Sequence, residues 1–162
     1  MSEQDTYRRL LAMLDAHGAR YRLIDHAPEG QTDLVSALRG HDVGSAAKCL
    51  VIMAKIGKKT TKYVLAVVPG GRRIDLTAVK SLLGATYVAF ASTDVAERLA
   101  GSVVGTILPF ALTPELELIV DPALRDTSEV FFNAARLDRS IALRTADYFA
   151  IAKPRLAVMT QR

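Results

Sequence analysis

Two segments of the 162-residue sequence combine residue types that could do chemistry. Lys48 stands directly before the apolar run CLVIMAKI, so its ammonium group would lie at the mouth of a strand and could hold a phosphate or a carbonyl oxygen. Further along, GSVVGTILP (101–109) places Gly105 four residues before Pro109. Glycine lets the backbone approach a ligand and proline stiffens the turn, so this segment could aim N–H groups at a developing oxyanion. Both have structural alternatives, a lysine that snorkels at a strand end and a glycine-kinked buried strand.

Other reactive patterns are weaker. SAAK (45–48) fits the S-x-x-K pattern of serine acylases, but the companion motifs S-D-N and K-T-G are absent from the sequence. GSVVGT lacks the lysine of a phosphate-binding P-loop. His17, His26 and His41 lie far apart and form no metal-binding spacing. We therefore expect neither a metal ion nor a cofactor.

Basic residues are concentrated in one part of a chain whose formal net charge is +4. No acidic residue interrupts the six that fall between positions 55 and 73, namely Lys55, Lys58, Lys59, Lys62, Arg72 and Arg73. Such a cluster favours a polyanion such as nucleic acid, although a solvated hairpin rim would have the same composition.

Composition and length restrict the class of protein. The apolar run Val103–Leu112 is too short for a membrane helix, which needs about 20 residues. The polar start MSEQDTYRRL does not have the form of a signal peptide. Cys49 is the single cysteine, which excludes an internal disulfide and fits a reducing compartment. We expect a cytoplasmic protein that has no contact with a membrane and folds as a single domain over residues 1–162.

Hydrophobic periodicity predicts a mixture of helices and strands without regular βαβ alternation. Tyr7, Leu10, Leu11 and Leu14 predict a first helix that Gly18 ends. Further helices are expected at 32–38, with Thr32 as its N-cap, at 77–83, at 92–99 and from 145 until Pro154. Strands are expected at 21–25, 86–90, 116–121, 129–132 and 140–144, with a hairpin over 49–68. The predicted class is α+β (mixed α/β), with a mixed β-sheet flanked by helices.

Four segments, in their order and spacing, resemble one protein family. They are AKCLVIMA, RIDLTAVKSLLGA, the segment that contains Gly105 and Pro109, and FFNAARLDRSIALRTADY. Over nearly its whole length the chain resembles the YbaK family of free-standing aminoacyl-tRNA deacylases, which is related to the inserted editing domain of bacterial prolyl-tRNA synthetases. VSALRG, LIVDPAL and FNAARLDRSIALRTADYFAIAKPRL are most similar to the YeaK-like subgroup, which edits seryl- and threonyl-tRNA.

The resemblance implies the fold of that editing domain and hydrolysis of the ester in mischarged Ser-tRNA or Thr-tRNA. It implies that Lys48 holds the oxygens of the terminal nucleotide or the carbonyl, and that the segment from Gly105 to Pro109 supplies backbone donors. The substrate-binding residues would be Thr32, Ser102, Val104, Thr106, Ile107, Leu108, Asn133 and Asp138. The partner would be mischarged tRNA, bound through the basic hairpin, and an aminoacyl-tRNA synthetase is a second candidate partner.

The sequence departs from the family pattern at defined positions. Ala135 stands where many relatives have the glycine of N-A-G, and alanine-specific relatives carry a histidine near Asn133. YeaK-like members have cysteines near Thr32 and Ser102. Two other functions stay open, a non-catalytic module that binds tRNA or a synthetase, and a hydrolase of small esters. The deacylase mechanism requires that Lys48 and the Gly105 segment face one another.

Overall fold

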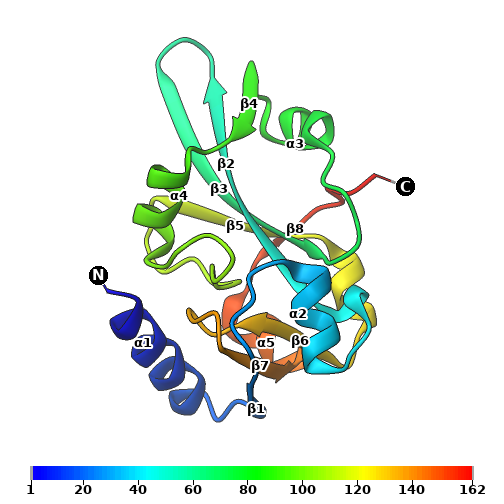
Figure 1. The fold of residues 1–162 in the computed structure, drawn as a ribbon. Coiled ribbons are helices and arrows are strands. Elements are labelled where there is room, and N and C mark those ends of the chain that lie inside the picture. Colours follow the sequence, from blue (N-terminus) through cyan, green and yellow to red (C-terminus); the bar gives the residue numbers. More distant parts are fainter. Residues whose placement is uncertain (1, 162) are drawn as a thin grey trace.

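Helices and strands alternate irregularly in the computed structural model of the protein, which describes residues 2–161 (Figure 1). The α-helices are α1 (Glu3–Ala16), α2 (Thr32–Arg39), α3 (Leu76–Leu83), α4 (Thr93–Ala100) and α5 (Thr145–Ala152), and Val43–Ser45 and Pro122–Asp126 form short 3-10 helices. The strands are β1 (Tyr21–Asp25), β2 (Ala47–Ile56), β3 (Thr60–Pro69), β4 (Tyr87–Phe90), β5 (Leu116–Val120), β6 (Glu129–Asn133), β7 (Arg139–Arg144) and β8 (Arg155–Leu156). The predicted mixed α+β class is confirmed.

The strands are divided between two sheets. A five-stranded mixed sheet has the order β4-β2-β3-β5-β8, in which β2 pairs antiparallel with β3 and β4, and β5 pairs parallel with β3 and β8. The strands β1, β7 and β6 form a separate antiparallel sheet, seen below the long β2–β3 hairpin in Figure 1. The sequence pattern predicts these strands but carries no signal that they form a second sheet, because β1 pairs with β7, which lies far away in the chain.

The five-stranded sheet is buried on both faces at its centre. On β3, Val64, Ala66 and Val68 contribute to a small core with α3, whereas Leu65 and Val67 belong to the larger core shared with α1, α4 and the second sheet. This division follows from the alternation of side chains along a strand. All five side chains are fully buried, and burial of each larger one stabilises the fold by roughly 1.5–3 kcal/mol.

Three helices begin at a side-chain cap. Ser2, Asp75 and Ser92 accept backbone hydrogen bonds at the starts of α1, α3 and α4. The prediction for α2 is wrong by one residue, because Gln31 is the N-cap and Thr32 is the first helical residue. The Thr32 methyl group instead packs tightly on the backbone of Gly70, where an added Cβ would lie 2.7 Å from Cγ2.

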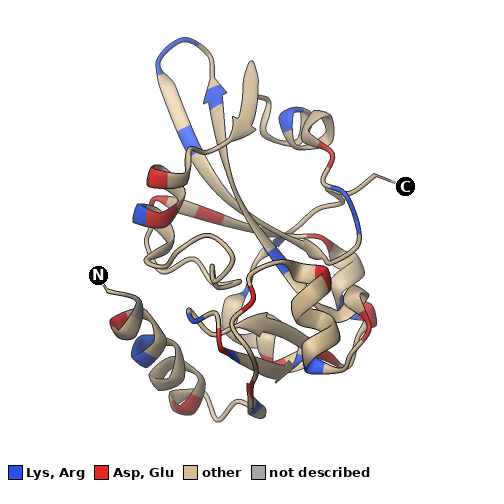
Figure 2. Cartoon of the chain, in the orientation of Figure 1, with Lys and Arg blue, Asp and Glu red and all other residues tan. Residues whose placement is uncertain are grey.

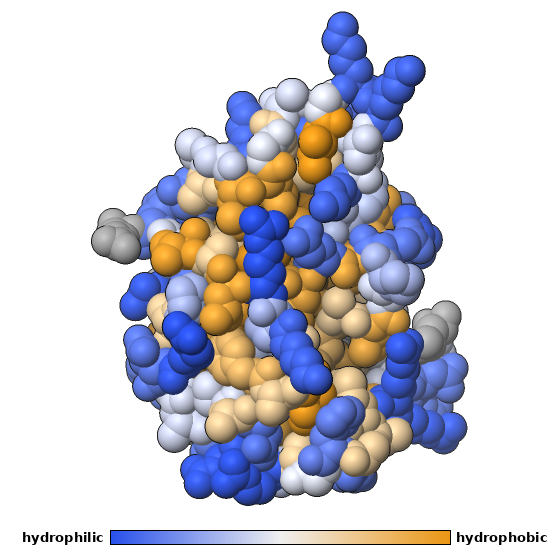
Figure 3. Space-filling view, turned by 180° about the vertical axis from the view of Figure 1, so that it is seen from behind, coloured by the Kyte–Doolittle hydropathy of each residue, from blue (hydrophilic) through white to orange (hydrophobic). Residues whose placement is uncertain are grey.

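The apolar segment 101–115 forms an irregular loop between α4 and β5. Ile107, Leu108 and Phe110 are buried in the larger core, so the loop is held by its side chains rather than by a ladder of strand hydrogen bonds. Within residues 2–161, no helix has both the length and the apolar character needed to cross a membrane. Figure 3 shows apolar surface in the middle of the opposite face of the molecule, crossed and surrounded by hydrophilic side chains.

Candidate functional site

A pocket of about 350 Å³ lies where the start of β2 meets α2, the loop before α2 and the 101–109 loop. This volume falls within the range of about 300–1,000 Å³ that is usual for small-ligand sites. We call it the inner pocket. Six of the predicted catalytic and substrate-binding residues line it: Thr32, Lys48, Val104, Gly105, Ile107 and Asn133. Lys48 and Gly105, which are 57 positions apart in the sequence, therefore share one site, as the deacylase mechanism requires.

Helix α2 lines one wall of the inner pocket with Thr32, Val35 and Arg39. Their spacing of i, i+3 and i+7 places them on one helix face. The sequence prediction did not include Arg39, although this spacing from Thr32 carried the signal. Arg39 lies in the last turn of α2, where a basic residue is usually explained by its favourable interaction with the helix dipole. Its position on the pocket face was therefore overlooked.

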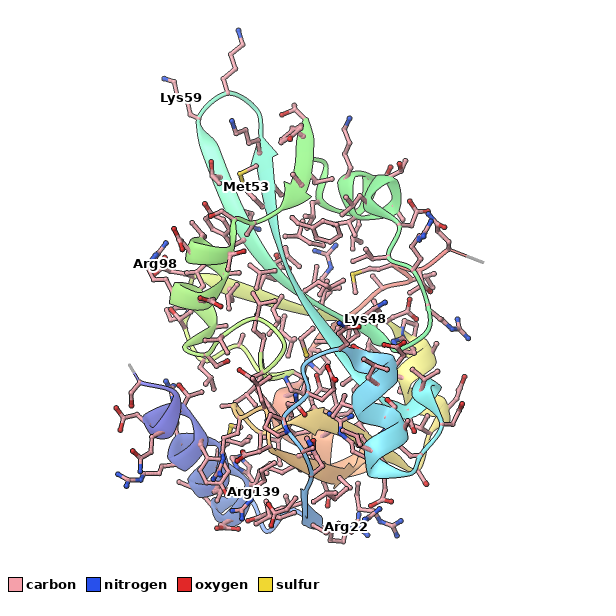
Figure 4. The ribbon with its side chains drawn as sticks, viewed as in Figure 1. Arg22, Lys48, Met53, Lys59, Arg98 and Arg139 are labelled. Atoms are coloured by element: carbon pink, nitrogen blue, oxygen red, sulfur yellow. The ribbon has the colours of Figure 1, made fainter. Side chains whose placement is uncertain are left out.

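Lys48 is half-buried near the start of β2, close to α2 in Figure 4. Its Nζ donates a hydrogen bond to the carbonyl oxygen of Arg72 at 2.5 Å. Burial lowers the pKa of the Lys48 ammonium, and the nearby charge of Arg73 lowers it further. Both effects make an anionic or carbonyl oxygen a favourable additional partner for this group.

Asn133, at the end of β6, joins the two loops that border the inner pocket. Its Nδ2 donates to the carbonyl oxygens of Glu29 at 2.8 Å and Gly105 at 3.0 Å. Its Oδ1 accepts from Arg39 Nη2 at 2.9 Å and Ser140 Oγ at 2.8 Å. The primary amide has two donors and two lone pairs, so these contacts use all of them. The arrangement therefore favours a role in holding the loops over the predicted contact with the substrate's amino group or water.

Arg39 brings a positive charge to the wall of the inner pocket among neutral partners. Besides Asn133, its guanidinium donates to Ser140 Oγ at 2.8 Å and to His41 Nε2 at 3.4 Å. Burial lowers the pKa of Arg39 to about 10 and lowers that of His41, whose ring stacks on Phe131 with centroids 3.7 Å apart. No carboxylate of residues 2–161 lines the pocket, so its field favours negative charge that develops inside it.

The backbone at Gly105 has a conformation that other residues rarely adopt. Its φ is +94°, and an added Cβ would lie 3.1 Å from the Cα of Gly30 on the facing loop. The carbonyl of Gly105 is taken by Asn133, and the N–H of Thr106 donates to Val103 O at 2.9 Å. Among the groups that line the pocket, the N–H groups of Gly105 and Ile107 are therefore the better candidates for donors to a ligand.

Four other predicted residues of this loop lie behind the pocket wall. Ser102 Oγ donates to Thr106 O at 3.3 Å, and Thr106 Oγ1 donates to Val103 O at 2.7 Å. Leu108 is buried in the core, and the carbonyl of Pro109 accepts a hydrogen bond from Tyr148 at 2.7 Å. Direct contact with a substrate was expected for Ser102, Thr106 and Leu108, but their side chains stabilise the loop from within.

Two further predicted positions lie outside the inner pocket. Asp138, predicted to contact the substrate, forms an ion pair with Arg136 at 2.9 Å. Ser45, the serine of the S-x-x-K pattern, donates to Asp42 O at 2.8 Å and does not line the pocket with Lys48. The geometry gives the serine-acylase alternative no support.

The basic run between positions 55 and 73 divides into two separate regions. Lys55, Lys58, Lys59 and Lys62 surround the turn of the β2–β3 hairpin, which we call the hairpin tip (Figures 2 and 4). Arg72 and Arg73 follow β3 at the opposite end, beside Lys48. Ten paired residues separate the two ends by roughly 30 Å. At the tip, Lys62 is also paired with Glu117 at 3.5 Å.

The acidic, histidine and cysteine side chains of residues 2–161 form no group of three or more that could hold a metal ion. Cys49 lines the inner pocket, but burial raises the pKa of its thiol well above the ordinary range. A protonated thiol is a poor nucleophile, so Cys49 is a weak candidate for covalent chemistry.

Comparison with known proteins gives consistent matches along the chain. Residues 26–151 match the model of the aminoacyl-tRNA editing domain family. The chain is 39% identical over 152 residues to the multifunctional Ser/Thr-tRNA deacylase ProXp-y of Escherichia coli (strain K12), covering 93% of this chain and 90% of that protein. It is 24% identical to the prolyl-tRNA editing protein ProX of Acetoanaerobium sticklandii, with 93% of each chain covered.

Solved structures agree on the fold. A hypothetical protein superposes with a TM-score of 0.83 at 22% identity, over 94% of this chain and 99% of that chain. A proposed trans-editing enzyme for prolyl tRNA synthetase superposes with a TM-score of 0.79 at 21% identity, over 97% and 98%. At this level of identity the likeness concerns the fold alone.

Proposed function

We propose that this chain, which belongs to the aminoacyl-tRNA editing domain family, hydrolyses the ester of mischarged aminoacyl-tRNA, with seryl and threonyl esters as its substrates. The family match confirms the resemblance predicted from the sequence. The observation that carries the proposal is the position of Lys48 and Gly105 in one pocket. The 39% identity to a protein named as a Ser/Thr-tRNA deacylase supports the choice of substrate.

The reaction depends on position and electrostatics. The oxygen of a water molecule attacks the acyl carbon, and the negative charge that develops on the carbonyl oxygen is stabilised by the N–H groups of Gly105 and Ile107. Lys48 holds the oxygens of the terminal nucleotide and orients the ester. The bond to the ribose oxygen then breaks, and the proton lost by water ends on that oxygen. The products are the free amino acid and a tRNA with its terminal hydroxyl restored.

Selection of a small hydroxylated amino acid fits the walls of the inner pocket. Val35, Ile107 and Phe132 supply apolar surface that restricts the size of the side chain. Exclusion of one methylene is worth only about 1–3 kcal/mol, whereas a polar group that the wrong substrate leaves unpaired discriminates more strongly. We propose that the hydroxyl of Thr32, whose methyl group is held against Gly70, pairs with the hydroxyl of the substrate.

The biological setting follows from the substrate. Mischarged tRNA is the proposed partner, attracted by the hairpin tip and by Arg72 and Arg73. We further propose that the protein works in the cytoplasm as a single domain, and that a synthetase could present the tRNA to it. The excess of positive charge at both ends of the hairpin, where no acidic residue interrupts the sequence from 55 to 73, supports the attraction of a polyanion.

The direct test is release of amino acid from Ser-, Thr-, Ala- and Cys-tRNA by the protein, by Lys48→Ala and by Lys58→Ala. We expect rapid loss of the seryl or threonyl ester with the protein and with Lys58→Ala, which removes a lysine at the hairpin tip. Lys48→Ala should lose at least about 100-fold in kcat/KM, since positioning in the site is disturbed.

Other results would change the conclusion in defined ways. Preference for the alanyl or cysteinyl ester would keep the reaction and reject the role of Thr32. Binding of tRNA without hydrolysis of any ester would identify a non-catalytic module. Equal hydrolysis of free seryl esters, with no advantage for the tRNA ester, would identify a small-ester hydrolase.

A further inference from the structure

A second and more open pocket of about 620 Å³ lies beside the inner pocket. We call it the outer pocket. It shares Lys48 and Leu50 with the inner pocket, and its other side is built by the turn after β3, the start of α3 and the end of β4. Because side chains alternate along β2, Ala47 and Cys49 face only the inner pocket. Lys48 therefore stands at the boundary between the two cavities.

An aromatic ring forms one wall of the outer pocket. Phe90 is the last residue of β4 and lies directly opposite Ile52 of β2, so its side chain is on the same face of the sheet as Lys48 and Leu50. Ile52 on that face is fully buried, whereas Phe90 is 53% exposed. Its ring is available to a planar group that enters the pocket.

Positive charge also lines the outer pocket. Arg72 and Arg73 line the outer pocket together with Lys48, and no acidic side chain of residues 2–161 lines it. Asp75, which follows in the chain, uses its carboxylate to accept the N–H groups of Thr77 and Ala78 at the start of α3. The lining of the outer pocket thus combines three cations with a half-exposed ring and with the apolar side chains of Leu50, Ile74 and Leu76.

We infer that the outer pocket binds the single-stranded 3′ end of tRNA, with a base stacked on Phe90 and phosphates bound by Arg72 and Arg73. A nucleotide combines a flat apolar face with a negative phosphate, which is the combination that this pocket offers. The inference rests on the proposed function, because Lys48 at the boundary would then lie beside the terminal ribose. The single strand would occupy the outer pocket, and the ester on that ribose would enter the inner one.

The test measures binding of a short fluorescent single-stranded RNA that ends in CCA and carries no amino acid. Phe90→Ala is compared with Tyr87→Ala, because Tyr87 lies on the same strand, is also 53% exposed and does not line the pocket. Loss of one base–aromatic stack is worth about 1–3 kcal/mol, so Phe90→Ala should weaken binding roughly 5- to 150-fold. Tyr87→Ala should change binding less than about twofold, since surface substitutions seldom have larger effects.

Two further variants identify the chemistry of the contact. Phe90→Tyr keeps the ring and should retain binding, whereas Phe90→Leu keeps apolar volume and should bind as weakly as Phe90→Ala. Arg72→Gln combined with Arg73→Gln should weaken binding and reduce its salt dependence more than Lys58→Gln combined with Lys59→Gln. Equal effects of Phe90→Ala and Tyr87→Ala, or of the two pairs of basic residues, would overturn the inference.

Hydrolysis of seryl-tRNA by the same variants separates the two proposals. We expect Phe90→Ala to raise KM and leave kcat nearly unchanged, because the ring binds substrate without touching the ester. If seryl-tRNA is hydrolysed but Phe90→Ala weakens RNA binding no more than Tyr87→Ala does, the RNA-binding role of the outer pocket is rejected and the proposed function is kept. Binding of RNA that depends on Phe90, without hydrolysis of any ester, would reject the proposed function and keep the outer pocket as an RNA site.

Discussion

The inner pocket and the hairpin tip lie at opposite ends of the β2–β3 hairpin, and they differ in how firmly their polar and basic side chains are held. At the inner pocket, Asn133 makes four hydrogen bonds, and Lys48 is half-buried and bonded to a carbonyl. At the tip, Lys58 and Lys59 are exposed beside the turn at Gly57 (Figure 4). The first region is pre-organised, and the second is solvated and adaptable.

This difference indicates two kinds of contribution to one reaction. Groups with fixed partners can stabilise charge at a defined point without reorganising, so their removal affects catalysis steeply. Exposed lysines attract a polyanion over a distance set by ionic strength, and each contributes little. Variants of the inner pocket should therefore lose activity at any salt concentration, whereas variants of the tip should lose it only at low salt.

Among the loop residues that border the inner pocket, the largest effect is expected from Gly105→Ala. The added methyl group would meet the backbone of Gly30, and the alanine would have to adopt a φ of +94°. The loop therefore has to move away from its position. A displacement of about 1 Å can cost about 100-fold in rate, and we expect a loss of that order in kcat/KM for seryl-tRNA.

Gly84→Ala is the matched control for this prediction. Gly84 also has a positive φ, of +61°, but an added Cβ would meet nothing within 4 Å, and it does not line the inner pocket. The free energy of unfolding of the Gly84→Ala variant should fall by about 1–2 kcal/mol, and the variant should keep its activity at 25 °C. Comparable activity of the two variants would show that the loop position does not matter to the reaction.

A smaller but still large effect is expected from Asn133→Asp. The carboxylate can still accept hydrogen bonds from Arg39 and Ser140, but it cannot donate to the carbonyl oxygens of Glu29 and Gly105. Each unsatisfied buried carbonyl costs about 1–3 kcal/mol, so the two loops should separate from β6. We expect a fall in kcat/KM of about 10- to 100-fold, since each 1.36 kcal/mol is a factor of ten.

Ser140→Ala provides the comparison on the other side of the amide. It removes the hydrogen bond to Asn133 Oδ1 and those that Ser140 Oγ makes with Arg39 Nε and His26 Nε2, but it leaves both bonds from Asn133 to the loops in place. Its effect on kcat/KM should be several times smaller than that of Asn133→Asp. If the two variants were equally impaired, the role of Asn133 would be general stability rather than attachment of the loops.

The hairpin tip should respond weakly and in a way that depends on salt. Lys58→Gln combined with Lys59→Gln should reduce kcat/KM a few-fold at low ionic strength, with a smaller slope of log affinity against log salt. Arg8→Gln combined with Arg9→Gln removes the same charge from the exposed face of α1 and should have less effect. A loss at the tip that persisted at high salt would contradict a purely electrostatic role.

The sequence was sufficient for features with local causes. Apolar periodicity and the glycines at helix ends predicted nearly all elements, and the family resemblance selected Lys48 and Gly105, which line one pocket in the structure. The single basic run was misleading, because an extended hairpin separates its two ends by roughly 30 Å.

Features that depend on distant partners could not be predicted. Asn133 receives its role from Arg39 and Ser140 and from two carbonyl oxygens, one of them 104 positions away in the chain. The side chains of Ser102 and Thr106 turn into their own loop because backbone acceptors are closer than the pocket. No spacing rule reports such choices, since they depend on the finished packing.

The smallest effect is expected from Ala135→Gly, behind the inner pocket. Ala135 has a φ of +59° and is fully buried, but it does not line the pocket, so the methyl group that many relatives lack is part of the core. Relief of the left-handed backbone is worth about 1–2 kcal/mol. The gain is offset by about 0.8 kcal/mol for the lost buried methyl group and about 0.4–1 kcal/mol for the greater freedom of the unfolded chain.

These opposing contributions should leave the free energy of unfolding within about 1 kcal/mol of its original value in a urea titration, with kcat/KM unchanged. Ala134→Gly is the control, because Ala134 is equally buried and is not among the residues with positive φ. Ala134→Gly relieves no backbone strain, so its free energy of unfolding should fall by about 1–2 kcal/mol. Equal destabilisation by the two variants would show that the backbone at position 135 is not strained. A loss of activity in Ala135→Gly alone would show instead that packing behind the pocket wall, and not only its lining, controls the reaction.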